Sequence, residues 1–221
     1  MPSLIKYLYG KKEFLEPVVK GEISLRFSDL SHYARLENDA MRDDEMSKTF
    51  TIDKFTNTLT INGRKIDPKS ITKDIELSIP TRHCYCLCLS NSKNSDELFK
   101  KFDAKICIEI KVDILIEFLT DYFGNCFKGM QVEGRDISYY GGKYLPKDAT
   151  ALDLVFYKPN SFKHEDEYRI ALFYPEDKPG FADLEGVIIP FVNSESQHMS
   201  FKYPEKELFT QFIGETYELK A

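Results

Sequence analysis

The sequence predicts an α+β fold with mixed, mostly antiparallel sheets and a few peripheral helices. Segments with the alternation of a strand outnumber segments with a helical period. Strands and helices also follow one another irregularly, which argues against a doubly wound parallel sheet. A chain of 221 residues, 42% hydrophobic and 30% charged, can form one such core. We therefore expect a single domain over residues 1–221, with a hairpin insertion around residues 48–80.

The first third of the chain supplies the first elements. Residues 4–9 are an apolar and aromatic run typical of a strand. Apolar residues at 14–19 follow a helical period that Gly21 ends. Residues 23–27 alternate apolar and polar side chains and predict a second strand. The charged stretch 29–45 predicts a helix.

The middle and the end of the chain are richer in strands. A hairpin is expected from residues 49–53 and 58–61, closed off by Asn62-Gly63. Further strands are expected at 71–79, 83–89, 105–110, 152–157, 168–174, 184–190 and 199–203. Helices are expected at 96–102, at 112–123 before Gly124, and after Pro204.

Composition excludes several classes of protein. The net charge of −6 argues against a general nucleic-acid coat, so any nucleic-acid contact must be local. Five cysteines, an odd number, are typical of reduced thiols, and neither a signal peptide nor a membrane span is evident. We expect a cytoplasmic protein without a membrane partner.

Common catalytic and metal-binding motifs are absent. The sequence contains no HExxH, Walker loop, GxGxxG or GxSxG, and its four histidines lack the spacing of metal ligands. Cys84, Cys86 and Cys88 alternate on one strand, so their thiols share one face and favour a core position over a metal site. We expect no metal.

Two charged clusters remain as candidate sites. The first, residues 35–45, fits a solvated helix face, or a divalent-ion site at Asp43, Asp44 and Glu45 of a nuclease-like or hydrolytic effector. The second, residues 158–169, precedes an apolar strand on which Glu167 and Arg169 share a face. This cluster is typical either of a site where a carboxylate beside an arginine stabilises charge or of a surface salt bridge.

Several short motifs carry a resemblance to a known family. They are the first strand Ile5-Lys6-Tyr7-Leu8-Tyr9, the strand ending in Phe27-Ser28, the segments from His32 to Glu37 and from Arg42 to Glu45, Cys88-Leu89-Ser90, and Lys158-Pro159 with Phe162 and Glu167-Tyr168-Arg169. In this order they resemble a poorly characterised family of bacterial and phage-associated proteins of unknown function.

The overall plan is also similar to that of ADP-ribosyltransferase-like proteins. This resemblance implies that Lys6 and Tyr7 form the first NAD-binding motif and Ser28, with Tyr33 nearby, the second. Glu167 would be the catalytic acid, with Glu165 as its rival. Tyr7 and Tyr33 would stack on the nicotinamide, and Arg42 or Arg169 would bind the diphosphate. The first strand lacks the usual Arg or His of such transferases.

The chemistry of that reaction suits a fixed carboxylate. Cleavage of the nicotinamide–ribose bond gives the sugar oxocarbenium character, which a carboxylate close to the ribose stabilises. The resemblance thus implies an NAD-dependent toxin or phage-defence effector. NAD would be its substrate and a nucleic acid or protein its acceptor, and a neutralising antitoxin could accompany it. The alternative is a non-enzymatic protein-binding module of a defence or stress-response system.

Overall fold

The computed structural model describes residues 3–36, 44–142, 144, 146–191, 195, 197–201, 207 and 210–219. Within them the predicted class is confirmed: the fold is α+β, and every described strand pairing is antiparallel except that of β10 (Ser138–Tyr140) with β11 (Tyr157–Pro159). None of the helices in these ranges is both long and apolar enough to span a bilayer.

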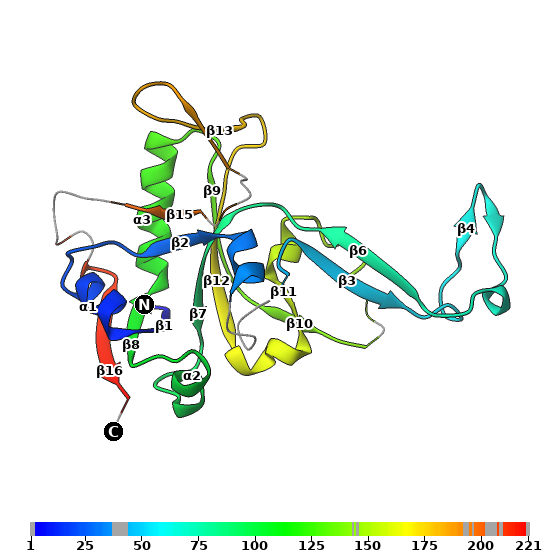
Figure 1. The fold of residues 1–221 in the computed structure, drawn as a ribbon, viewed down its shortest axis with the longest axis horizontal. Helices are drawn as coiled ribbons and strands as arrows, with labels where there is room; N and C mark the ends of the chain where they lie inside the picture. The colour runs from blue at the N-terminus through cyan, green and yellow to red at the C-terminus, as the bar shows by residue number, and fades with distance from the viewer. Residues whose placement is uncertain are drawn as a thin grey trace.

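An eight-stranded sheet forms the body of the molecule (Figure 1). Six strands follow one another in the order β15-β2-β7-β1-β8-β16, and β12 joins β7 to β9. Their bounds are Ile5–Gly10 for β1, Arg26–Asp29 for β2, Tyr85–Ser90 for β7, Ile106–Lys111 for β8, Gln131–Asp136 for β9, Glu167–Phe173 for β12, His198–Ser200 for β15 and Ile213–Glu218 for β16.

Helix α3 (Val112–Cys126) covers one face of this sheet. Leu115, Leu119 and Phe123 recur at helical spacing and are buried. They pack in one cluster with the sheet residues Tyr85, Leu87, Leu89, Tyr168, Ile170 and Leu172. Two shorter helices, α1 (Lys12–Val19) and α2 (Asp96–Lys101), lie at the edges. The helix α3 runs two residues past Gly124, where the sequence predicted its end.

The opposite face of the sheet carries the cysteines and the charged residues. Cys84 and Cys86 are buried there with Ala171 and Phe173 of β12, so the predicted core position of these two thiols is confirmed. Three 3-10 helices cover this face: η1 (Leu30–Arg35), η3 (Asp153–Phe156) and η4 (Asn160–Glu165). Asp29 begins η1 by accepting a hydrogen bond from the Ser31 amide at 2.9 Å.

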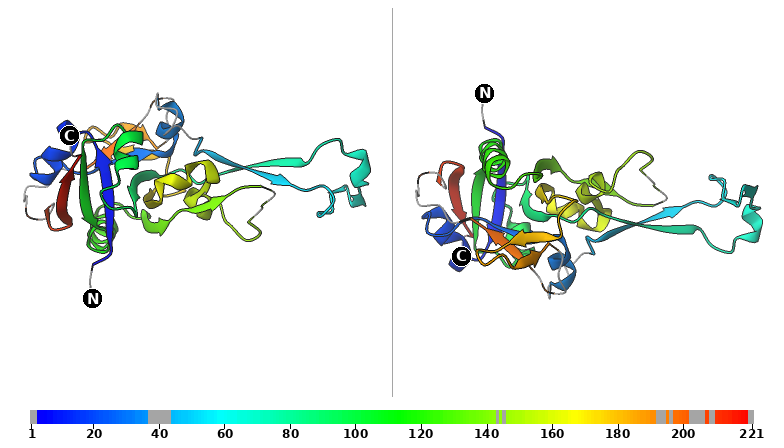
Figure 2. Two further views of the ribbon diagram at one scale, coloured as in Figure 1. Left: turned by 90° about the horizontal axis from the view of Figure 1, so that it is seen from below. Right: turned by 90° about the horizontal axis from the view of Figure 1, so that it is seen from above.

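A long two-stranded arm, residues 47–80, projects away from the body in every view (Figures 1 and 2). Its strands β3 (Ser47–Ile52) and β6 (Ile75–Pro80) pair over six residues. Beyond them β4 (Thr60–Ile61) and β5 (Arg64–Lys65) flank Asn62-Gly63, whose φ angles of 50° and 78° suit a tight hairpin turn. A short 3-10 helix, η2 (Pro68–Ser70), follows.

The predicted pairing of residues 49–53 with 58–61 is therefore wrong. Residues 60–61 pair across Asn62-Gly63, whereas β3 pairs with the distant β6. Two-residue strands offer little to pair with, and β3 is oriented by the body, because Phe50 is buried against Tyr140 at a ring distance of 4.7 Å.

Other local predictions also need correction. The helix expected at 29–45 is limited to η1 in its described part, and residues 37–43 lie outside the described ranges. Residues 153–156 form a 3-10 helix instead of the expected strand, because Thr150 and Asp153 hold the chain in a turn: the Thr150 amide donates to Asp153 Oδ2 at 2.9 Å. Strands β9 and β16 escaped prediction, as did β13 (Gly180–Ala182), which pairs with β14 (Ile188–Pro190). Most of the predicted C-terminal helix lies outside the described residues.

Candidate functional site

Six ionisable side chains form a buried ionic network on the cysteine face of the sheet. Three are carboxylates and three are cations, and each is less than a tenth exposed: Glu45, Lys48, Lys158, Glu165, Glu167 and Arg169. Burying a charge costs several kcal/mol unless partners compensate it. The network therefore persists only because each charge meets others of opposite sign.

Arg169 is the centre of the network. Its two terminal nitrogens donate to the two carboxylate oxygens of Glu45, Nη1 to Oε2 at 3.0 Å and Nη2 to Oε1 at 2.8 Å. Its Nε donates to Glu167 Oε1 at 2.8 Å, and Nη1 also donates to the Val155 carbonyl at 2.7 Å. The fork of Arg169 thus binds the Glu45 carboxylate, and its Nε holds the Glu167 side chain from one side.

Lys158 holds the two other glutamates. Its Nζ donates to Glu165 Oε2 at 2.6 Å and to Glu167 Oε2 at 3.0 Å, and lies 3.7 Å from Glu45 Oε1. Lys48 donates to Glu45 Oε2 at 2.5 Å. The Glu167 amide donates to Tyr139 Oη at 2.8 Å. Glu167 is therefore held at both carboxylate oxygens and at its backbone.

The environments of Glu167 and Glu165 separate their pKa values. Burial opposes ionisation of Glu167, but the charges of Arg169 and Lys158 outweigh it and lower its pKa to about 2. For Glu165, burial and the neighbouring Glu167 charge outweigh Lys158 and raise its pKa to about 7. Two carboxylates that share one lysine thus differ in protonation near neutral pH: Glu167 is a fixed anion and Glu165 exchanges a proton.

An aromatic cavity of about 490 Å³ opens beside the network. It lies where the sheet splits: β2 pairs with β7 at Tyr85 and Cys86, whereas β1 meets the same edge only at Ser90. Between these points, residues 87–89 of β7 pair only with β12 in the described pairings. Because β1 and β2 diverge here, a hollow remains above Cys88 and Leu89.

The walls of the aromatic cavity combine rings with charges. The rings are those of Tyr7, Tyr9, Phe14, Tyr33 and Phe102. The exposed Lys11, Arg26 and Asp103 add charges near the opening, where Lys11 lies 3.7 Å from Asp103. Lys158, Glu165 and Glu167 form the polar end. The Cys88 thiol donates to Tyr33 Oη at 3.1 Å, and burial raises the pKa of Tyr33 well above its usual range. The volume is in the range of sites for small organic ligands.

The fold brings together some of the sequence-predicted site residues. Tyr7, Tyr33 and Glu167 come from three segments of the chain and line the same cavity, together with the rival acid Glu165. Glu165 is not on the strand, as its spacing predicted, because η4 ends there and Asp166 has a φ of 46°. This turn still directs Glu165 toward Lys158.

Lys6 and Ser28 lie elsewhere. Lys6 is buried and contacts Asn91 and Asp136, the latter at 3.3 Å, in a separate hollow that Glu167 also lines. Ser28 is buried on β2, and its hydroxyl lies 3.0 Å from His198 Nδ1. Neither side chain is among those that line the aromatic cavity.

Of the two arginines expected to bind the diphosphate, the structure describes only Arg169. Arg169 is fully buried and its guanidinium is taken up by Glu45, Glu167 and Val155, so it positions Glu167 and does not face the cavity. It is not part of a surface salt bridge. Arg42 lies outside the described residues, as does Asp43.

In the first charged cluster, residues 35–45, Glu45 does not belong to the solvated face that the composition suggested. Asp44 is exposed, but Glu45 is buried and bound by Arg169 and Lys48. Burial would raise the pKa of Glu45, yet Arg169, Lys48 and Lys158 hold it well below its usual range. Its oxygens are occupied by cations of the protein. Among the described residues, no three His, Cys, Asp or Glu side chains gather in a way that could hold a metal ion.

Sequence reasoning missed the roles of Glu45, Lys158 and Arg26 in this site. The alternation on β1 that singles out Tyr7 also places Tyr9 on its face, and the same rule pairs Arg26 with Ser28. The burial of Glu45 and Lys158 has no local signal, because it depends on β12 meeting segments far away in the chain.

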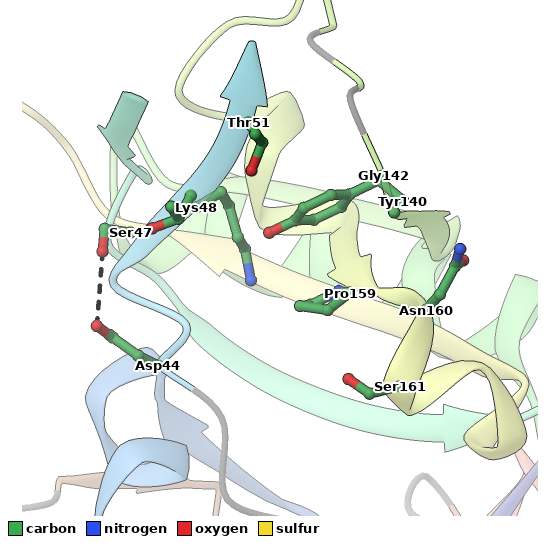
Figure 3. A pocket seen from close by; sticks show the side chains of 11 residues that line it. Asp44, Ser47, Lys48, Thr51, Tyr140, Gly142, Pro159, Asn160 and Ser161 are labelled. Carbon is green, nitrogen blue, oxygen red and sulfur yellow. Dashed lines mark hydrogen bonds between the residues drawn. The ribbon is translucent and has the colours of Figure 1, made fainter. Parts of the chain in front are cut away.

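A second hollow of about 480 Å³, the arm-base cavity, lies where the arm joins the body. Figure 3 shows Ser47, Lys48 and Thr51 of β3 facing Tyr140, Pro159 and Asn160 across it. Lys48 belongs to both places, since it lines this cavity and donates to Glu45. The root of the arm is thereby tied to the ionic network.

Comparison of the chain with protein-family models, with curated proteins and with solved structures finds no match in any of the three.

Proposed function

We propose that the protein is an NAD-dependent ADP-ribosyltransferase with an ADP-ribosyltransferase-like fold and that the aromatic cavity binds NAD. The observation that carries this proposal is the convergence of Tyr7, Tyr33 and Glu167 on one cavity. Rings suited to stacking stand beside a carboxylate held as an anion, which is the pairing that nicotinamide–ribose cleavage needs. Arg26, near the opening, supplies charge for the diphosphate, and Lys11 adds to it beside its partner Asp103, 3.7 Å away.

The proposed reaction divides the work between the two glutamates. The bond between ribose C1′ and the nicotinamide nitrogen breaks, and its electron pair neutralises the pyridinium, so nicotinamide leaves uncharged. Glu167 stabilises the positive charge that develops on the ribose. An acceptor oxygen or nitrogen bonds to C1′, and its proton passes to the Glu165 carboxylate, whose pKa of about 7 suits a general base. The proton-transfer role extends the proposal to Glu165 without displacing Glu167.

Replacement of Glu167 by Gln tests the proposal. We expect the purified wild type to bind NAD, and the Glu167→Gln variant to release nicotinamide at least about 100-fold more slowly, because a preorganised charge typically contributes that much. The readouts are nicotinamide release and transfer of label from adenylate-labelled NAD to macromolecules in a lysate. Glu109→Gln is the matched control, because Glu109 is also a buried sheet carboxylate, bound by Lys93 and Tyr217 outside the cavity.

Glu167→Gln also disturbs a buried network, so a variant at the rings accompanies it. Tyr7→Ala leaves every ionic contact in place and is expected to weaken NAD binding, measured by calorimetry. A wild type that shows no NAD binding would refute the proposal, whatever the variants do.

A further inference from the structure

The tip of the arm, residues 53–74, differs in charge from the rest of the chain. It carries five cations (Lys54, Arg64, Lys65, Lys69 and Lys73) and three carboxylates (Asp53, Asp67 and Asp74), a formal net charge of +2. Since the whole chain has −6, the remainder has −8. A polyanion is therefore repelled by the rest of the chain and attracted to this end.

The carboxylates of the arm tip are used internally. Asp53 accepts a hydrogen bond from the Phe55 amide at 2.8 Å, Asp67 from the Lys69 amide at 2.9 Å, and Asp74 from the Lys54 amide at 3.4 Å. These bonds stabilise the turns of the tip.

Four of the five cations remain exposed. Lys54 donates to the Ile71 carbonyl, but Arg64, Lys65, Lys69 and Lys73 are exposed and, within the described ranges, form no ion pair. Two large apolar side chains stand among them: Phe55 is 66% exposed and Ile61 is 55% exposed. Cations interleaved with exposed apolar groups are the composition of a nucleic-acid contact.

The shape of the arm selects the kind of nucleic acid. Strands β3 and β6 form a two-stranded stalk that extends clear of the body (Figure 2) and carries the tip, where β4 and β5 form a short two-stranded ribbon. The major groove of B-form DNA admits such a ribbon, whereas that of an RNA duplex is too narrow. Phosphates flank the groove for the cations, and thymine methyl groups within it offer contacts for Phe55 and Ile61.

We infer that the arm tip is a docking surface for duplex DNA. This inference rests on the proposed function in one respect: it assigns DNA, and not protein, as the acceptor of ADP-ribose. The body then binds NAD while the arm holds the acceptor molecule. The net negative charge of the chain is compatible with this role because the contact is local.

The inference is tested by fluorescence anisotropy with a labelled 20-base-pair DNA duplex. We expect binding by the wild type at 50 mM salt and a roughly 100-fold loss of affinity at 200 mM, as four phosphate contacts imply. The variant Arg64→Glu, Lys65→Glu, Lys69→Glu, Lys73→Glu should lose at least about 100-fold in affinity at 50 mM salt. It should still bind NAD, and it should no longer transfer label to the duplex.

A matched variant reverses four exposed lysines of the body: Lys20→Glu, Lys100→Glu, Lys128→Glu and Lys178→Glu. It changes the net charge equally and should weaken DNA binding far less. The inference is overturned if the wild type fails to bind the duplex, if both variants weaken binding equally, or if the arm tip binds phosphatidylserine vesicles but not DNA.

The two proposals fail in different ways. DNA binding by the arm without NAD binding overturns the proposed function and leaves the docking surface in place. NAD cleavage without DNA binding overturns the docking surface and leaves the enzyme.

Discussion

Arg169 shows how a residue can be essential to a site without facing it. It binds Glu45 at both oxygens and Glu167 at one, and it is fully buried. A guanidinium in this position has lost its water and depends on these carboxylates. Its role is to hold Glu167 ionised and in place, so changes at its partners act on both stability and the site.

Loss of Glu45 should therefore be costly. We expect Glu45→Gln to lower the free energy of unfolding by about 3 kcal/mol, because it leaves the charge of buried Arg169 undercompensated. Urea denaturation measures this, with Asp44→Asn as the control, since Asp44 is adjacent but exposed. A cost below about 1 kcal/mol would show that Arg169 does not need the Glu45 charge.

Glu165 should make stability depend on pH. Its pKa is raised from 4.5 to about 7, so its contribution is fully present below pH 4.5 and is lost as pH rises to 7. Over that range the wild type should lose up to about 3 kcal/mol relative to Glu165→Gln, by urea denaturation at several pH values.

The comparison with Glu165→Gln is needed because other groups titrate nearby. Burial lowers the pKa of each of the four histidines, including His32 and His198, and their contribution is lost as pH falls. Both proteins contain these histidines, so their effect cancels in the difference. Parallel curves for the two proteins would contradict the raised pKa of Glu165.

At the scale of elements, the arm joins two roles. Its root delivers Lys48 to the ionic network beside Glu45, which lies just before the arm. Thr81, just after the arm, joins the two ends by donating to the Glu45 carbonyl at 2.7 Å. The tip of the arm, in contrast, is outside the hydrophobic clusters of the body. The sequence predicted an insertion near this place because of its short strand-like runs, but not which runs pair.

This division predicts that the tip is dispensable for folding. Ile52 and Ile75 are paired, so an Asn-Gly turn in place of residues 53–74 joins them as a two-residue hairpin. We expect the shortened protein to melt within a few degrees of the wild type and to bind NAD normally, by calorimetry, but not DNA. If the body instead unfolds when residues 53–74 are replaced in this way, the tip contributes to the core.

At the scale of the whole molecule, the central sheet joins distant parts of the chain. β8 lies between β1 near the beginning of the chain and β16 near its end. Strands β1, β7, β8 and β12 were predictable, because their segments have apolar runs, or an alternation of apolar and polar residues, that are typical of strands. β9 and β16 carry mixed polar sequences, so only their pairing with β12 and β8 makes them strands.

Alternation is a property of the local backbone, so the sequence alone tells which side chains share a strand face. That rule places Glu167 with Arg169, and Tyr7 on a face of the first strand. Two features follow from the tertiary fold instead: Glu45 is buried against Arg169, 124 residues away, and the sheet splits to form the aromatic cavity. Both depend on which strands meet, and pairing between distant segments is governed by the packing of the whole core rather than by any local pattern.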